Sequence, residues 1–192
     1  MNKLTLLIPI IALAGCANSQ TDSISLDKLL ENPLFAERYA DEKVDAIVEF
    51  KIQKDPIIED SSKEKIMEKE RKEWLAVAKD ATAKQRAGTR GNLIEITEYA
   101  NGEALYLEDK LYFGPELETI PSVELHVYLT TVVDPRDIEF PDEQALDLGE
   151  LQTPYGAQVY NVPHQEDPLL YRTVVIWDEK LEKIWSFAQL SK

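Results

Sequence analysis

The sequence contains one cysteine, two histidines and two methionines in 192 residues. Because the only cysteine is Cys16, the chain beyond it has no internal disulfide, no zinc–thiolate site and no cysteine nucleophile. Haem iron is held by axial ligands such as histidine, methionine or cysteine, so few residues could serve. Met67 falls on the apolar side of a predicted helix and is expected in the core. The sequence therefore predicts no bound cofactor and a body held together by packing alone.

Basic residues are scarce relative to acidic ones: 21 Lys and Arg face 36 Asp and Glu, for a net charge of −15. Such a surface repels nucleic acid and anionic lipid headgroups, so we expect no nucleic-acid partner. The chain also lacks a Gly-Lys-Ser/Thr phosphate loop and a Gly-x-Ser-x-Gly elbow. We predict no enzymatic activity and assign no catalytic residue. An enzyme acting on envelope glycans stays an alternative, because spacing alone cannot identify a catalytic carboxylate pair.

The two histidines do not predict a metal site. His126 alternates with Leu125 and Val127 in a predicted strand, so it is expected on the sheet exterior or as a hydrogen-bonded core residue. His164 follows Pro163 in a predicted loop and is expected to be exposed. The acidic segment 134–147 offers oxygen ligands, but it lacks the alternating Asp/Asn spacing and the glycine of a calcium-binding loop.

Long apolar runs are missing as well, apart from a short one at the N-terminus. Lys3 precedes the apolar residues 4–12, and Leu13-Ala14-Gly15-Cys16 follow. A basic start, a short apolar run and small residues predict an export signal over residues 1–15. The run is well below the roughly 20 residues needed to span a bilayer. Two kinds of export signal fit this segment. One is an ordinary signal in which Cys16 is incidental, and the other is a signal in which Cys16 takes part in processing.

Leu13-Ala14-Gly15-Cys16 resembles the lipobox of bacterial lipoproteins. The resemblance implies cleavage between Gly15 and Cys16, a diacylglycerol on the Cys16 thiol and an acyl group on its amine. One acyl chain holds a protein only marginally, whereas two or three give stable attachment. Residues 16–24 are polar and predict a flexible tether. We expect a membrane-anchored protein outside the cytoplasm; in a Gram-negative cell Ala17 would favour the outer membrane, on its periplasmic or surface face.

Residues 25–90 have a helical pattern with two main helices. Asn32-Pro33 is typical of a helix start, and Asp55-Pro56 interrupts the pattern. A second helix is predicted from Ser61 to about Ala87, with Ser61 and Glu64 at capping-box spacing. Its narrow apolar stripe predicts packing on the first helix and on the domain that follows; the stripe consists of Ile66, Met67, Trp74, Leu75, Val77, Ala78 and Ala81.

Residues 91–192 have the pattern of short strands separated by turns. Asn101-Gly102 predicts a two-residue hairpin turn, because both residues tolerate positive φ. The chain is therefore predicted to be mainly β: an antiparallel sandwich or barrel-like domain preceded by a helical segment. The predicted strands are 93–99, 104–108, 111–113, 124–132, 146–151, 157–162, 173–177 and 183–190.

Four stretches of this β-region, in order, resemble the DM-thirteen domain, a β-domain family found outside the cytoplasm. The resemblance covers roughly residues 94–190 and implies an antiparallel β-domain associated with electron transfer. Trp177 and Trp185, on the last two predicted strands, are expected to pack in its interior. The matching stretches are 105–109, 119–129, 147–163 and 171–190.

Two departures from the family pattern bear on function. Ser122-Val123 stand where the family usually has Gly-Pro, and Asp178 stands where it usually has a cysteine. An aspartate cannot cycle between thiol and disulfide, so a redox role through that residue is absent. We predict a lipid-anchored, non-catalytic binding or structural module with an unknown ligand and an unidentified envelope protein as its partner. The alternative is an accessory component of an extracytoplasmic electron-transfer system.

Overall fold

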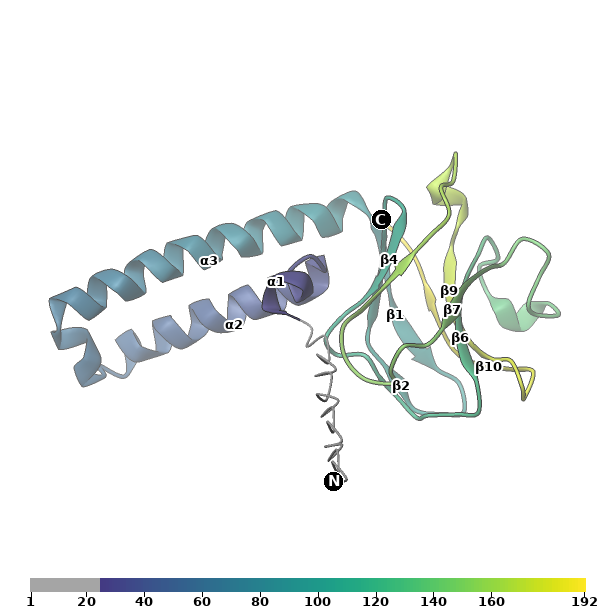
Figure 1. Ribbon diagram of the computed structural model, residues 1–192, viewed down its shortest axis with the longest axis horizontal. Coiled ribbons are helices and arrows are strands. Elements are labelled where there is room, and N and C mark those ends of the chain that lie inside the picture. The colour runs from purple at the N-terminus through teal and green to yellow at the C-terminus, as the bar shows by residue number, and fades with distance from the viewer. Residues whose placement is uncertain (1–24) are drawn as a thin grey trace, which may run out of the picture.

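The computed structural model describes residues 25–192, which form a long helical hairpin attached to a β-domain (Figure 1). The domain is an eight-stranded, nearly closed, barrel-like sheet in which every pairing is antiparallel. The predicted fold class, a mainly β domain preceded by two main helices, is confirmed. Across residues 25–192, no helix combines the length and apolarity that a bilayer crossing requires.

The hairpin consists of α2 (Pro33–Ile52) and α3 (Ser61–Ala87), with the short α1 (Leu26–Leu29) before it and the 3₁₀ turn η1 (Pro56–Glu59) at its tip. Asn32 caps α2 as predicted, because its Oδ1 accepts hydrogen bonds from Leu34 N (3.0 Å) and Phe35 N (3.4 Å).

The predicted capping box of α3 is wrong. Asp60 is the N-cap, and its Oδ1 accepts from Ser62 N (2.9 Å) and Lys63 N (3.3 Å). The helix therefore includes Ser61 as its first residue. The Asp60 carboxylate is both an acceptor and a negative charge at the positive end of the helix dipole, which favours it over the Ser61 hydroxyl.

The two helices pack through small residues. Ala40 on α2 and Ala81 on α3 are almost fully buried, and they let the backbones approach closely. Farther along the hairpin, Tyr39 packs edge-to-face on Trp74 with ring centroids 5.1 Å apart. Ile66 does not join this contact as the stripe predicted: it is 62% exposed, because it lies near the tip, beyond the packed part of α2.

The strands of the main sheet lie in the order β7-β6-β9-β10-β1-β3-β4-β8. Its two edges, β7 and β8, come together through side chains: Gln152 N donates to Tyr160 Oη (3.0 Å) and Gln152 Nε2 to the Val159 carbonyl (2.9 Å). The strands are β1 (Thr89–Glu95), β3 (Glu103–Leu107), β4 (Lys110–Phe113), β6 (Leu125–Thr130), β7 (Leu146–Glu150), β8 (Gln158–Asn161), β9 (Thr173–Asp178) and β10 (Lys183–Gln189); β2 (Ala100–Asn101) pairs separately with β5 (Glu118–Thr119).

The predicted turn at Asn101-Gly102 is wrong. The β1–β3 connection is longer, and Asn101 belongs to β2. Gly102 has φ +133°, and a Cβ there would lie 2.8 Å from Leu117 Cα, so the glycine serves a close backbone approach. The tight turn is Glu108-Asp109, between Leu107 and Lys110, where Glu108 adopts φ +55°.

Alternation along the central strands separates two apolar clusters. On β6 and β9, Val127, Leu129, Val174 and Ile176 face the barrel interior. On the outer face of the sheet, residues of β6, β9 and β10 form a second cluster with Phe140 from the segment 131–145. This outer cluster consists of Tyr128, Phe140, Val175, Trp177 and Phe187. Both predicted tryptophans are buried, Trp185 in the interior and Trp177 in this outer cluster.

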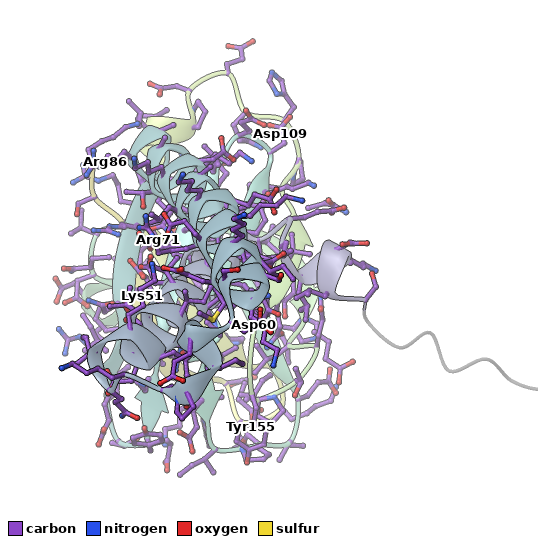
Figure 2. The ribbon with its side chains drawn as sticks, turned by 90° about the vertical axis from the view of Figure 1, so that its left-hand side faces the viewer. Lys51, Asp60, Arg71, Arg86, Asp109 and Tyr155 are labelled. Carbon is purple, nitrogen blue, oxygen red and sulfur yellow. The ribbon has the colours of Figure 1, made fainter. Side chains whose placement is uncertain are left out.

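The hairpin is joined to the barrel at its base. Asn32 Nδ2 donates to the Phe113 carbonyl of β4 (2.8 Å), and Leu34 packs against Leu105 and Tyr112. Figure 2 looks along the hairpin, with Lys51 and Arg71 on the helices in front and Asp109 and Tyr155 at opposite ends of the barrel behind. The hairpin thus contacts the barrel through its base, and its tip points away from the barrel (Figure 1).

Candidate functional site

The predicted lipid-attachment and cleavage residues, Cys16 and Gly15, lie outside the described residues, as does the whole of the predicted signal and tether. In residues 25–192, two candidate functional side chains lie at the end of β9: Asp178 and Glu179, which follow Trp177. Their side chains have different partners, so they are described separately.

Asp178 is fully buried and accepts four hydrogen bonds. Its Oδ1 accepts from Lys180 N (3.0 Å) and Leu181 N (2.9 Å), which closes the turn into β10. Its Oδ2 accepts from Ser122 Oγ and from Val123 N (3.2 Å), which ties the segment before β6 to that turn. Burial alone would raise the pKa of the Asp178 carboxyl, but the four hydrogen bonds outweigh burial and hold the pKa below its ordinary value.

His126 lies on the opposite face of the sheet, with its side chain one-fifth exposed. Its Nδ1 is 3.1 Å from Asp147 Oδ1 on β7 and 3.2 Å from Oδ2. Gly149 N donates to the same Asp147 Oδ1 (2.8 Å) and fixes that carboxylate. On the other side of the ring, Glu124 Oε1 is 4.0 Å from His126 Nε2. His126 thus faces outward, as one of the two predicted interpretations had it, and is surrounded by carboxylates.

Glu179 completes this group from the turn after β9. Ligand atoms of His126, Asp147 and Glu179 all lie within 4.8 Å of one another, and within residues 25–192 no other group of three such side chains is so arranged. The buried Tyr128 hydroxyl donates to Glu179 Oε1. Burial and this hydrogen bond to a carboxylate raise the pKa of Tyr128 well above its ordinary range.

The sequence pattern did not indicate this group, and no metal site was predicted from it. Its three members come from β6, β7 and the β9–β10 turn, which are neighbours only because β6 pairs with both β7 and β9. The one signal available was the alternation that placed His126 and Tyr128 on one face of a strand.

The other histidine makes a similar but smaller contact. His164 Nδ1 is 3.1 Å from Asp109 Oδ1 and 3.2 Å from Oδ2, and the His164 side chain is 80% exposed, as predicted. Among the residues that the structure describes, no third ligand completes a group of the kind formed around His126. This pair lies at the β3–β4 turn, near the label for Asp109 in Figure 2.

A depression of about 840 Å³ lies beside Glu179, over the outer apolar cluster. Phe140 and Trp177 line it, together with five carboxylates: Glu139, Asp142, Glu143, Glu179 and Glu182. Such a concentration of one sign of charge produces a negative potential that attracts cations.

Two carboxylates of the acidic segment 134–147, Asp134 and Asp142, make local contacts. Arg136 donates hydrogen bonds to Asp134, which lower the pKa of that carboxyl to about 2, and Asp142 accepts from Thr130 Oγ1 (2.6 Å). Of this segment, only Asp147 belongs to the His126 group.

Comparison with known families identifies the β-domain. The family described as Electron transfer DM13 matches residues 76–190, from the middle of α3 to the residue after β10. The match therefore starts earlier than the resemblance found in the sequence and takes in the half of α3 next to the barrel. No curated protein and no solved structure matches the chain. Since the match covers more than half of the sequence, the chain belongs to the DM13 family.

Proposed function

We propose that this chain is a lipid-anchored DM13 protein, held outside the cytoplasm, which acts by binding a partner and has no catalytic activity of its own. The single observation that supports a binding role over thiol redox chemistry is the state of residue 178. Asp178 is a buried carboxylate that accepts four hydrogen bonds, and the only cysteine of the chain is Cys16. A thiol–disulfide cycle in this domain has no sulfur to use.

The two departures from the family pattern, Ser122-Val123 and Asp178, support the same proposal, because they are hydrogen-bonded to each other. Ser122 Oγ and Val123 N, at one departure, donate to Asp178, at the other. A residue held from two segments in this way acts as a fixed tie between β6 and β10 and is not free to react.

The lipid anchor is proposed from Leu13-Ala14-Gly15-Cys16 and is tested by replacing the sulfur. In Cys16→Ala we expect the mature acylated mass to disappear and the chain to be unprocessed or released from the membrane fraction. Intact-mass spectrometry and membrane fractionation measure both effects. Ser19→Ala, three residues along the tether, is the matched control and should keep the lipid. An unchanged mass and unchanged membrane retention in Cys16→Ala would refute the anchor.

The binding role is tested on protein purified from its native envelope. We expect a partner protein to co-purify in stoichiometric amount after cross-linking, and the visible absorbance spectrum to have no haem or charge-transfer band. A stoichiometric haem or redox-active metal in the purified protein would overturn the binding-module proposal.

The family description favours a second candidate, an accessory component of an extracytoplasmic electron-transfer system. Without a thiol at residue 178, such a component would contribute by docking a redox partner. A colourless protein whose cross-linked partner carries a haem or flavin would favour this candidate, whereas partners with no redox group would count against it.

A further inference from the structure

The geometry points to a divalent-cation site formed by His126, Asp147 and Glu179 on the outer face of the barrel, suited to zinc or a similar borderline cation. This inference goes beyond the proposed function and does not depend on the lipid anchor. One imidazole and two carboxylates are ligands that zinc accepts, and three protein ligands leave a coordination position open for water or for a group from another molecule.

The separations are close to those of an inner coordination shell. Ligands bound tetrahedrally to one zinc ion at 2.0–2.2 Å lie about 3.3 to 3.6 Å from each other. His126 Nδ1 and Asp147 Oδ1 are already 3.1 Å apart, and Glu179 brings a carboxylate oxygen within 4.8 Å of both. For the third ligand to bind, the Glu179 side chain has to move toward the other two. His126 and Asp147 are held by the β6–β7 pairing, so two of the three ligands lie on rigid strands.

The surrounding residues are arranged as an outer shell. A metal-bound histidine usually donates its other ring N–H to a carboxylate, and Glu124 Oε1 lies 4.0 Å from His126 Nε2. Tyr128 Oη donates to Glu179 Oε1 and leaves Oε2 free for a cation. Gly149 N donates to Asp147 Oδ1 and orients that carboxylate. Asp147 and Glu179 thus each accept a hydrogen bond that orients them, and Glu124 lies near the second ring nitrogen of His126.

Charge and access favour a cation at this place. The half-exposed Asp147 opens the group to solvent, and the depression beside Glu179 brings four further carboxylates close to it. Lys180 is the basic residue next to Glu179, but its Nζ is 3.3 Å from Glu124 Oε2 and forms an ion pair there. A cation at the site relieves the repulsion among these carboxylates.

The chain supplies its own control. His164 and Asp109 have the same Nδ1 to carboxylate distances as His126 and Asp147, 3.1 and 3.2 Å, but no carboxylate of the described part of the chain stands in the place of Glu179. If an exposed His–Asp pair were sufficient, both histidines would bind zinc. If the third ligand is required, only His126 will.

The test is zinc titration of the full-length, chelator-treated protein by isothermal calorimetry. We expect one zinc per chain in the wild type. Outer-shell changes typically cost about 10- to 100-fold in affinity, so Tyr128→Phe should lose about tenfold and His126→Ala at least about 100-fold. His164→Ala should bind as the wild type does, and so should Cys16→Ala, which separates this inference from the lipid anchor.

A second measurement keeps the inference testable if His126→Ala fails to fold. In NMR spectra of the wild type, one equivalent of Zn²⁺ should shift the imidazole resonances of His126 and leave those of His164 in place. Absence of stoichiometric binding, equal loss in His126→Ala and His164→Ala, or equal shifts of both imidazoles would each overturn the site.

Discussion

Asp178 is the residue at which family resemblance and structure bear most directly on function. Its carboxylate is buried at the end of β9 and accepts four hydrogen bonds, three of them from backbone N–H groups. Removing such a buried acceptor costs more free energy of unfolding than the net contribution of its hydrogen bonds, because several buried donors are left without a partner. The residue therefore belongs to the stabilising framework of the domain.

Asp178→Asn should lower the free energy of unfolding by about 2 to 3 kcal/mol at pH 7, since the amide group cannot accept at both positions. Because the folded pKa of Asp178 lies below its unfolded value, the ionised carboxylate stabilises the protein above about pH 4 and loses its effect as pH falls through the folded pKa. Urea unfolding should therefore give a larger difference between wild type and variant at pH 7 than at pH 3.

Ser122→Ala is the control for this prediction, because it removes one donor and leaves the carboxylate and its backbone partners. It should cost about 1 kcal/mol. A pH-independent difference between Asp178→Asn and wild type would contradict an ionised Asp178 in the folded state.

Among the elements, β1 and the end of β10 lie so close at Gly91 that a side chain there would meet backbone. A Cβ on Gly91 would lie 2.1 Å from the Gln189 carbonyl oxygen, far inside contact distance, and no side chain is available to move aside. The glycine at this position is therefore required by the spacing of the two strands.

Gly91→Ala should destabilise the protein by about 2 to 3 kcal/mol, because the added methyl group pushes β10 away from β1. Gly114→Ala is the matched control: its Cβ would meet Leu34 at an ordinary contact distance of 3.5 Å, so little change is expected. Chemical denaturation of both variants measures the contrast. Equal stability of the two would show that β10 adjusts without cost.

Much of the element pattern could be predicted. Seven of the eight strands of the main sheet start and end within two residues of the predicted limits, because short runs rich in β-formers are bounded by turn residues; β1 instead starts and ends four residues earlier than predicted. The β1–β3 connection could not be predicted: Asn101-Gly102 has the sequence of a tight turn, but the pairing of β2 with β5 uses those residues differently. The turn that the structure does contain, at Glu108, has no glycine to indicate it.

At the scale of the whole molecule, the hairpin and the barrel differ in how they are stabilised. The central strands β6, β9 and β10 consist largely of buried residues, whereas the far half of the hairpin is mostly exposed. Surface ion pairs connect the helices there: Glu68 receives hydrogen bonds from Arg71 and Lys51, which lower the pKa of Glu68 to about 2. Such pairs are screened by salt and stabilise less than burial does.

We therefore expect residues 44–70 to open locally while the barrel stays folded. Hydrogen exchange measured by mass spectrometry should give these residues an opening free energy at least about 2 kcal/mol lower than that of β9 and β10. Raising the ionic strength should lower protection in the hairpin more than in the barrel. Uniform protection across both parts would mean that the hairpin unfolds only together with the barrel.

The sequence by itself determined the local features of this protein: two helices that begin at Asn32 and near Ser61, a run of short antiparallel strands, a strong negative charge and the resemblance to the DM13 family. Each depends on neighbouring residues or on composition. Only the tertiary structure decided that Ser122 and Asp178 touch, and that His126, Asp147 and Glu179 meet, because these contacts join residues brought together by the order of strands in the sheet. Alternation indicates which face a residue takes on its own strand, but which strands lie next to each other depends on the packing of the whole barrel.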